Sequence, residues 1–227
     1  MRVFQGVTGQ AGQPGTLAAG LRKIGIAADS ITIRDHAFGY GADRRFSTAR
    51  VKSLSDVDGI LQPLILDYDV FHFHAQSLFT IWPNLDSPSF QDIFILKMHG
   101  KKVFFHFRGQ EIRNSQKFKE LNPYHYVDEP SGYLFQKMPD KSKDVLRSAM
   151  TDLCDGVFVV DEELQTYVPD AEIVPRTLDA EAWGFVGVGE TDVPVVVHAP
   201  SRRGVKGTQH VLDALDALRG EGVKFEL

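Results

Sequence analysis

The chain has 227 residues, which is enough for one good-sized domain and part of another. Its composition, 43% hydrophobic and 24% charged, is ordinary for a soluble globular protein. Its formal net charge of −5 argues against non-specific binding of nucleic acid, which needs a basic surface. A single cysteine, Cys154, excludes a disulfide within the chain and suits a reducing compartment.

The amino-terminal residues 3–7 form the first predicted strand and lack the long apolar run of a signal peptide. No segment of the sequence contains the ~20 consecutive apolar residues that span a bilayer. We therefore expect a soluble, cytoplasmic protein, and peripheral contact with a membrane stays open.

Strands and helices are predicted to alternate along the chain. Six short apolar runs are predicted strands: 3–7, 28–33, 69–74, 102–107, 156–160 and 172–174. Five segments with apolar residues at helical spacing are predicted helices: 17–24, 60–66, 89–98, 145–153 and a short one around Leu164. This alternation favours right-handed crossovers and one parallel sheet, so we expect a Rossmann-like α/β fold with helices on both faces.

Two predicted helices have a defined apolar face. In the first it consists of Leu17, Leu21 and Ile24, and Gly25 ends the helix. In the longest it consists of Val145, Ala149 and Leu153. The stretches 34–57 and 109–141 lack such periodicity and are predicted to be surface loops.

The strand–helix pattern restarts near the carboxyl end, with a strand at 194–199, a helix through 211–218 and a strand from Gly222. One β-α-β unit is too small to form an adequate core by itself, so we expect a second domain that is truncated. The alternative is that this unit packs onto the first sheet. The predicted parts are a Rossmann-like domain at 1–183, a linker at 184–193 and the start of a second domain at 194–227.

The loop after the first strand contains Gly6, Gly9, Gly12 and Gly15. Glycines there let the backbone approach a ligand at the amino end of the next helix, where free N–H groups favour an anion. Because the spacing matches neither a dinucleotide-binding nor a Walker motif, a plain strand-to-helix turn is the alternative.

Three histidines lie in the third and fourth predicted strands. His72 and His74 point to the same side because side chains in a strand alternate, and His106 ends the neighbouring strand. Such a group could bind zinc or iron, and the alternative is a polar cleft without metal. Arg108, Glu111 and Arg113 come next, and they would either line a site or form a solvated ion-pair loop.

A basic loop at 201–208 lies between the restarting strand and its helix. Arg202, Arg203 and Lys206 precede the helix, and their charge combines with its dipole to predict a site for a phosphate or diphosphate. A solvated basic loop is the alternative.

Several of these segments together resemble the GT-B glycosyltransferases of the large retaining group called family 4. The matching segments are 68–74 (YDVFHFH), 101–113 (KKVFFHFRGQEIR), 155–164 (DGVFVVDEEL), 174–179 (VPRTLD) and 198–208 (HAPSRRGVKGT). Their order and spacing cover nearly the whole chain.

The resemblance implies two Rossmann-like domains across a cleft, the first holding an acceptor and the second a nucleotide-sugar. Retaining transfer then uses Arg203, Lys206 and His106 as the catalytic residues, with the two cations stabilising the departing nucleotide. The donor site implied by the resemblance comprises Gly9, Gly12, Ser201, Arg202, Arg203, Lys206 and Gly207. The implied cleft and acceptor residues are His74, Arg108, Glu111, Arg113 and Arg176.

The chain departs from the family pattern at Arg108, where the family has histidine, and at Arg176, where it has asparagine. The family's acidic motif for the donor belongs to the absent part of the second domain, so we expect this polypeptide to be inactive. The resemblance implies neither a metal nor another cofactor. Its partners would be the nucleotide-sugar and an acceptor that is a glycan, a lipid or a small molecule, with no nucleic acid. The alternative functions are a non-catalytic module that binds nucleotides or sugar phosphates, and a metal-dependent hydrolase using the histidines.

Overall fold

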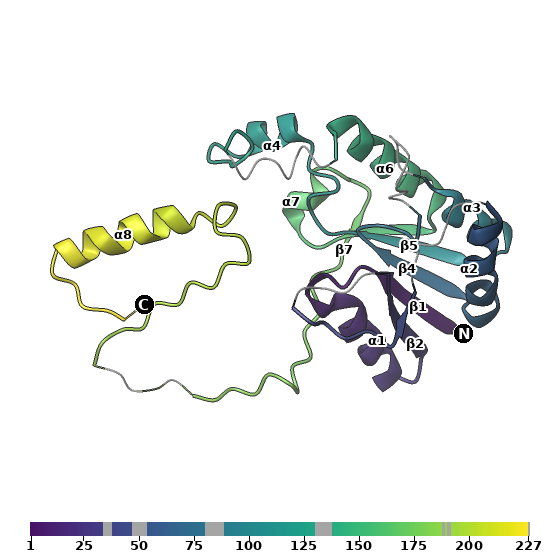
Figure 1. Ribbon diagram of the computed structural model, residues 1–227, viewed down its shortest axis with the longest axis horizontal. Coiled ribbons are helices and arrows are strands. Elements are labelled where there is room, and N and C mark those ends of the chain that lie inside the picture. The colour runs from purple at the N-terminus through teal and green to yellow at the C-terminus, as the bar shows by residue number, and fades with distance from the viewer. Residues whose placement is uncertain are drawn as a thin grey trace. The chain divides into compact units, whose positions relative to one another are not determined.

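The computed structural model describes residues 1–33, 38–46, 54–79, 89–129, 138–187, 189 and 192–226 (Figure 1). They form two compact units, one of Met1–Asn114 with Met138–Ala180 and the other of Ser115–Lys137 with Glu181–Leu227. The first unit contains the sheet, and the second contains the helices α4 (Ser115–Leu121) and α8 (Thr208–Gly220).

The sheet of the first unit has seven strands, all parallel, in the order β3-β2-β1-β4-β5-β6-β7. They are β1 (Arg2–Val7), β2 (Ala27–Thr32), β3 (Arg44–Arg45), β4 (Val70–His74), β5 (Lys102–Phe107), β6 (Gly156–Val159) and β7 (Glu172–Ile173). The predicted Rossmann-like parallel α/β sheet is thus confirmed. The strand order reverses between β1 and β4, and open sheets of this type bind ligands at such a switch point, beyond the carboxyl ends of the strands.

Helices pack on the two faces of this sheet (Figure 1). They are α1 (Gln13–Lys23, after the short 3-10 helix η1, Gln10–Gly12), α2 (Leu54–Asp67), α3 (Gln91–Met98), α6 (Asp140–Leu153) and α7 (Glu162–Gln165). Ala18 of α1 packs with Val3 and Ala28 on one face, whereas α2, α3 and α6 cover the larger core on the other. Among the described helices, none has the length and apolar character that crossing a bilayer requires.

The alternation of β4 and β5 separates the main core from the polar groups. Phe71, Phe73, Phe105 and Phe107 are fully buried in the larger core. Burying each such side chain stabilises the fold by about 1.5–3 kcal/mol. His72, His74 and His106 alternate with these phenylalanines, so they lie on the other face of the sheet, the one on which α1 packs.

The predicted apolar faces of two helices are right only in part. Leu21 of α1 packs against the smaller core, and Ala149 and Leu153 of α6 pack against the larger one. In α1, Ala18 is buried but Ile24 is 71% exposed, because the helix ends before Ile24 and turns away through Gly25. In α6, Leu146 and Met150 face the core and Val145 is exposed. The buried face of α6 includes Lys143, and a lysine hides that face from any pattern based on apolar residues.

The two predicted surface loops contain regular structure. Part of the first forms β3 and the beginning of α2, which starts at Leu54, and part of the second forms α4. No residue of α4 is buried, so it lacks the apolar stripe by which a helix is recognised. The remaining parts at 34–37, 47–53 and 130–137, which include Tyr133 and Phe135, lie outside the described residues.

The restarting β-α-β pattern of the second unit is only partly formed. The helix is present as α8, with Thr208 and Leu215 buried. The two predicted strands shrink to one parallel bridge, between Val195 and Glu226. A two-strand fragment has little core to hold longer strands together. The predicted domain bounds, 1–183 and 194–227, stay a prediction.

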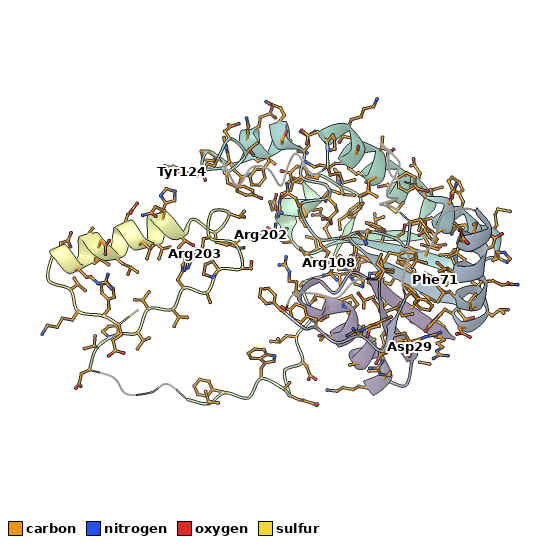
Figure 2. The ribbon with its side chains drawn as sticks, in the orientation of Figure 1. Asp29, Phe71, Arg108, Tyr124, Arg202 and Arg203 are labelled. Carbon is orange, nitrogen blue, oxygen red and sulfur yellow. The ribbon has the colours of Figure 1, made fainter. Side chains whose placement is uncertain are left out.

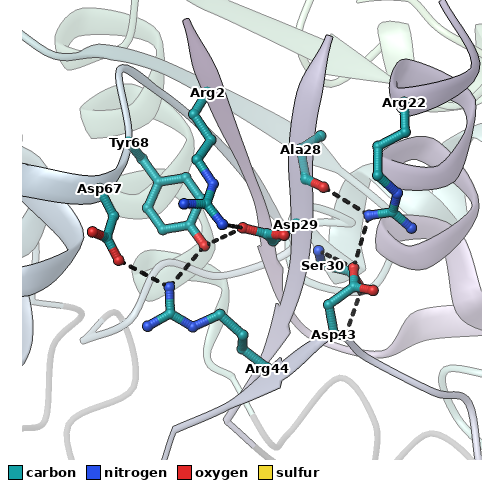
Figure 3. A network of polar contacts seen from close by, with 9 residues as sticks. All are labelled: Arg2, Arg22, Ala28, Asp29, Ser30, Asp43, Arg44, Asp67 and Tyr68. Carbon is teal, nitrogen blue, oxygen red and sulfur yellow. Dashed lines mark hydrogen bonds and ion pairs between the residues drawn. The ribbon is translucent and has the colours of Figure 1, made fainter. Parts of the chain in front are cut away.

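A polar network joins β1, β2 and β3 to the end of α2 (Figure 3). Arg2 Nη2 and the Tyr68 hydroxyl each lie 2.7 Å from Asp29 Oδ2, and Arg44 Nη1 donates to Asp67 at 3.0 Å. Burial, followed by the hydrogen bond to Asp29, raises the pKa of Tyr68 to about 12. Each arginine in this network has a carboxylate partner.

Candidate functional site

Three histidines gather near the carboxyl ends of β4 and β5. The register pairs His74 with His106. The ring of His72 lies 4.3 Å from that of His74 and 5.6 Å from that of His106, centroid to centroid. The predicted grouping of the three side chains is therefore confirmed.

His74 is fully buried and has a partner at each ring nitrogen. Its Nε2 lies 2.9 Å from Gln5 Oε1, and its Nδ1 contacts Nη2 of Arg108. Because a guanidinium can only donate, Nδ1 accepts, and the ring proton sits on Nε2 and is donated to Gln5. Sequence reasoning missed Gln5, although a polar residue at a buried position of β1 was the available signal.

The histidines are held in their neutral form. Burial, and then the charge of Arg108, lowers the pKa of His72 to about 3 and that of His106 to about 2. Burial, together with His72 and Arg108, places the pKa of His74 well below its ordinary value. At neutral pH these side chains therefore act as uncharged hydrogen-bonding groups.

The histidine group fits a metal ion poorly. One ring nitrogen from each of His72, His74 and His106 can be chosen so that all lie within 4.8 Å of one another. Both nitrogens of His74 are already hydrogen-bonded, and a cationic guanidinium contacts this would-be ligand. A metal would have to break those bonds and sit beside a positive charge.

Arg108 follows β5 and is only 7% exposed (Figure 2). Its Nη2 is used by His74, but within the described part of the chain Nε and Nη1 have no hydrogen-bond partner. Burial, followed by the charge of Arg176, lowers the pKa of Arg108 to about 10, and Glu111 opposes this. The side chain is therefore a buried cation at neutral pH.

Glu111 and Arg113 lie beside Arg108, as expected, and both hold the loop in place. Glu111 Oε1 accepts hydrogen bonds from the backbone N–H groups of Arg108 and Gly109. Arg113 Nε lies 3.0 Å from both carboxylate oxygens of Glu163 at the start of α7. Gly109 has a φ of 150°, and a Cβ there would lie 2.6 Å from the Arg113 guanidinium, so the turn requires glycine.

The glycine loop is linked to the segment after β7. Gly12 has a φ of 69° and precedes α1, whose first residue is the buried Gln13. The Gln13 amide donates to the Thr177 carbonyl at 2.9 Å and accepts from the Thr177 N–H at 2.7 Å. These bonds hold the backbone next to the exposed Arg176 at the start of α1. Gln13 is a second positioning residue that sequence reasoning missed.

The basic loop lies in the second unit, where Arg202 and Arg203 precede α8 (Figure 2). A cavity of about 300 Å³ lies at the start of α8 and includes Arg203 in its lining. The remaining lining residues are Glu129, Gly204, Gly207, Thr208, Gln209, His210 and Leu212. Of the predicted donor residues, Arg203 and Gly207 line this cavity, and Ser201, Arg202 and Lys206 do not.

Some backbone N–H groups of this loop donate to carbonyl groups of the same loop. The N–H of Lys206 donates to Arg202 O at 3.1 Å, and the N–H of Thr208 donates to Arg203 O at 3.0 Å. Gly207 caps α8 with a φ of 61°. The helix start therefore offers an anion the amides of the next residues, which line the cavity, together with the Arg203 side chain.

Searches against protein-family models, curated proteins and solved structures found no match for this chain.

Proposed function

We propose that the chain contains the N-terminal Rossmann-like domain of a GT-B glycosyltransferase and the start of its donor-binding domain. It would serve the transfer of a sugar from a nucleotide-sugar to an acceptor, with retention of configuration. The acceptor side would be the histidine and arginine group at the sheet edge, and the donor side would be the basic loop before α8.

The observation that carries this proposal is where the family-like segments lie. Residues 68–74 run into β4, residues 101–113 form β5 and its loop, and residues 174–179 follow β7. Parallel strands bring their carboxyl ends to one edge, so His74, His106 and Arg108 come together although the sequence separates them. Open parallel sheets usually bind their ligands beyond these carboxyl ends.

The side chains suit the charge changes of sugar transfer. A nucleoside diphosphate leaves with negative charge, and fixed cations stabilise that charge as it develops. Arg203 and the amino end of α8 line one cavity that could take a diphosphate. Lys206 belongs to the same loop and is exposed. The neutral His106 would offer hydrogen bonds to a sugar hydroxyl without competing for the diphosphate.

Titration calorimetry with UDP and GDP tests the donor site. We expect one of the two to bind in a 1:1 ratio, and Arg203→Ala and Lys206→Ala each to weaken it by about tenfold, the usual effect of losing a charge-assisted hydrogen bond. Lys224→Ala, which removes an exposed cation beyond α8, is the matched control and should leave binding unchanged. Absence of nucleotide binding, or equal affinity in all variants, would contradict the proposal.

Product analysis separates transfer from simple binding. We expect the purified chain to release no nucleotide from sugar nucleotides, because the resemblance places the acidic donor motif outside it. Steady release of UDP or GDP would refute that expectation.

A metal-dependent hydrolase is the second candidate: the histidine nitrogens lie within 4.8 Å of one another, whereas the hydrogen bonds of His74 count against a metal. Elemental analysis of the purified protein tests it directly. Stoichiometric zinc or iron that is lost in His72→Ala would support the hydrolase over the glycosyltransferase.

A further inference from the structure

Arg108 is a buried cation that forms no ion pair in the described part of the chain. Its side chain contacts the neutral His74, and two of its nitrogens, Nε and Nη1, donate to no described group. The arginines of the network near β2 differ, since Arg2 and Arg44 each pair with an aspartate. A guanidinium removed from water is costly unless a charge or hydrogen bonds compensate it.

The charged groups near Arg108 compensate its positive charge only in part, because Arg176 adds a second cation while Glu111 acts in the opposite direction. Arg176 is exposed, forms no ion pair with any described residue, and is near enough to affect the pKa of Arg108. Glu111 forms no ion pair with the Arg108 side chain; its Oε1 accepts hydrogen bonds from two backbone N–H groups of the turn. The three histidines are neutral, so they supply no negative charge.

The position of this charge is set by the surrounding contacts. The ion pair of Arg113 with Glu163 and the bonds accepted by Glu111 hold the loop after β5. The Gln13–Thr177 hydrogen bonds hold the segment that carries Arg176. Arg108 is fixed before a ligand arrives and the backbone beside Arg176 is held, so binding an anion costs little conformational freedom at Arg108 and more at the exposed Arg176 side chain.

We propose that Arg108 and Arg176 bind an anionic group of the sugar substrate, a carboxylate or a phosphate, at the carboxyl edge of β5. The assignment to a sugar substrate rests on the proposed function, whereas the anion site itself rests only on these residues. The anionic group has two sources: the C6 carboxylate of a uronic acid in the donor, or a phosphate carried by the acceptor. Either would pair with the guanidinium that a neutral sugar hydroxyl would leave uncompensated.

The test compares charged and neutral probes that differ in one group. Calorimetry at low ionic strength measures binding of glucuronate, glucose 6-phosphate, inorganic phosphate and, as the neutral control, glucose. We expect at least one anionic probe to bind in a 1:1 ratio, at least tenfold more tightly than glucose. Binding of glucuronate without phosphate assigns the group to a uronic-acid donor, and binding of phosphate and glucose 6-phosphate assigns it to a phosphorylated acceptor.

Variants connect the binding to these two residues. Arg108→Gln should weaken the anionic probe at least tenfold, and Arg108→Lys, which keeps a charge in the buried position, should restore part of the affinity. Arg176→Gln changes an exposed residue, so it tests the site even if Arg108→Gln fails to fold. Lys101→Gln removes a cation at the amino end of β5, away from Arg108 at its carboxyl end, and should leave the affinity for the anionic probe unchanged.

Failure of this inference can be distinguished from failure of the proposed function. Equal binding of anionic and neutral probes, or unchanged affinity in Arg108→Gln and Arg176→Gln, would overturn the anion site and leave nucleotide binding at Arg203 unaffected. An anionic probe lost in Arg108→Gln, with no UDP or GDP binding anywhere, would keep the anion site and reject the glycosyltransferase.

Discussion

Lowering the pH from 7 to 5 should destabilise the first unit through His72, His74 and His106. Each has an ordinary pKa of 6.5, and each is held neutral in the folded state by a pKa well below that value. The unfolded chain therefore takes up protons at pH 5 that the folded chain does not. Since the folded-state pKa values are depressed, the stability that these histidines contribute is present above 6.5 and is lost as the pH falls below it.

The magnitude follows from the ordinary pKa alone, because at pH 5 the folded histidines are still neutral. Protonating one free histidine at pH 5 favours the unfolded state by about 2 kcal/mol. Three such groups give a loss of about 6 kcal/mol between pH 7 and pH 5. The free energy of unfolding of a domain is usually about 5–15 kcal/mol, so this loss is a large part of it.

Asp92 opposes part of this loss. Burial raises its pKa to about 6, and hydrogen bonds from Ser77, Phe79 and Ile93 limit the shift. A carboxyl with a raised folded-state pKa binds a proton more readily when folded, so acidification to pH 5 stabilises the fold by about 1 kcal/mol through this group. Through these four groups the expected loss is about 4–5 kcal/mol, and Glu111, whose pKa burial also raises, acts in the same direction as Asp92.

Urea unfolding at pH 7 and at pH 5, followed by far-UV circular dichroism, measures this difference directly. His72→Asn removes one of the three titrating groups, so the difference between the two pH values should shrink by about 2 kcal/mol. His99→Asn, at the exposed end of α3, is the control and should leave the difference as in the unaltered chain. A free energy of unfolding that is the same at both pH values would refute the reasoning.

Three further predictions concern stability. Gly6→Ala should destabilise by about 1–3 kcal/mol, because its Cβ would lie 2.7 Å from the Ile31 carbonyl oxygen and 2.8 Å from the Phe4 ring. Gln13→Ala should cost about 1–3 kcal/mol, since it leaves the Thr177 backbone groups without their partner. Lys143→Ala should cost about 1–3 kcal/mol, because it removes the hydrogen bonds that the buried ammonium donates to the Arg113 carbonyl and to Asp140, each at 2.9 Å. Urea midpoints measure all three.

Each of these substitutions has a matched control. Gly20→Ala lies in an exposed turn of α1 with open space around it, and it should stabilise by up to about 1 kcal/mol. Thr16→Ala changes another polar side chain of α1 and loses a single bond to the Gly12 carbonyl. Lys141→Ala removes an exposed lysine of α6. Destabilisation by the controls equal to that of the test variants would contradict the assigned contacts.

Much of the candidate site could be predicted before the fold was known. The alternation in residues 69–74 placed His72 and His74 on one side of a strand, and adjacent parallel strands brought His106 to them. The partners of Gln5 and Gln13 could not be predicted, because His74 and Thr177 are 69 and 164 residues away. A hydrogen bond over that distance leaves no periodic signal in the chain.

The sequence by itself determined the α/β class and the parallel sheet. Short apolar runs that form strands and apolar residues spaced three or four apart that form helices are local properties of the chain, and here they alternate. Only the tertiary structure decided that α6 buries Lys143 and exposes Val145, since a lysine can be buried when Asp140 and the Arg113 carbonyl satisfy it. The same holds for Arg108. Its charge is written in the sequence, but its burial beside His74, without a carboxylate, follows from how distant strands come together.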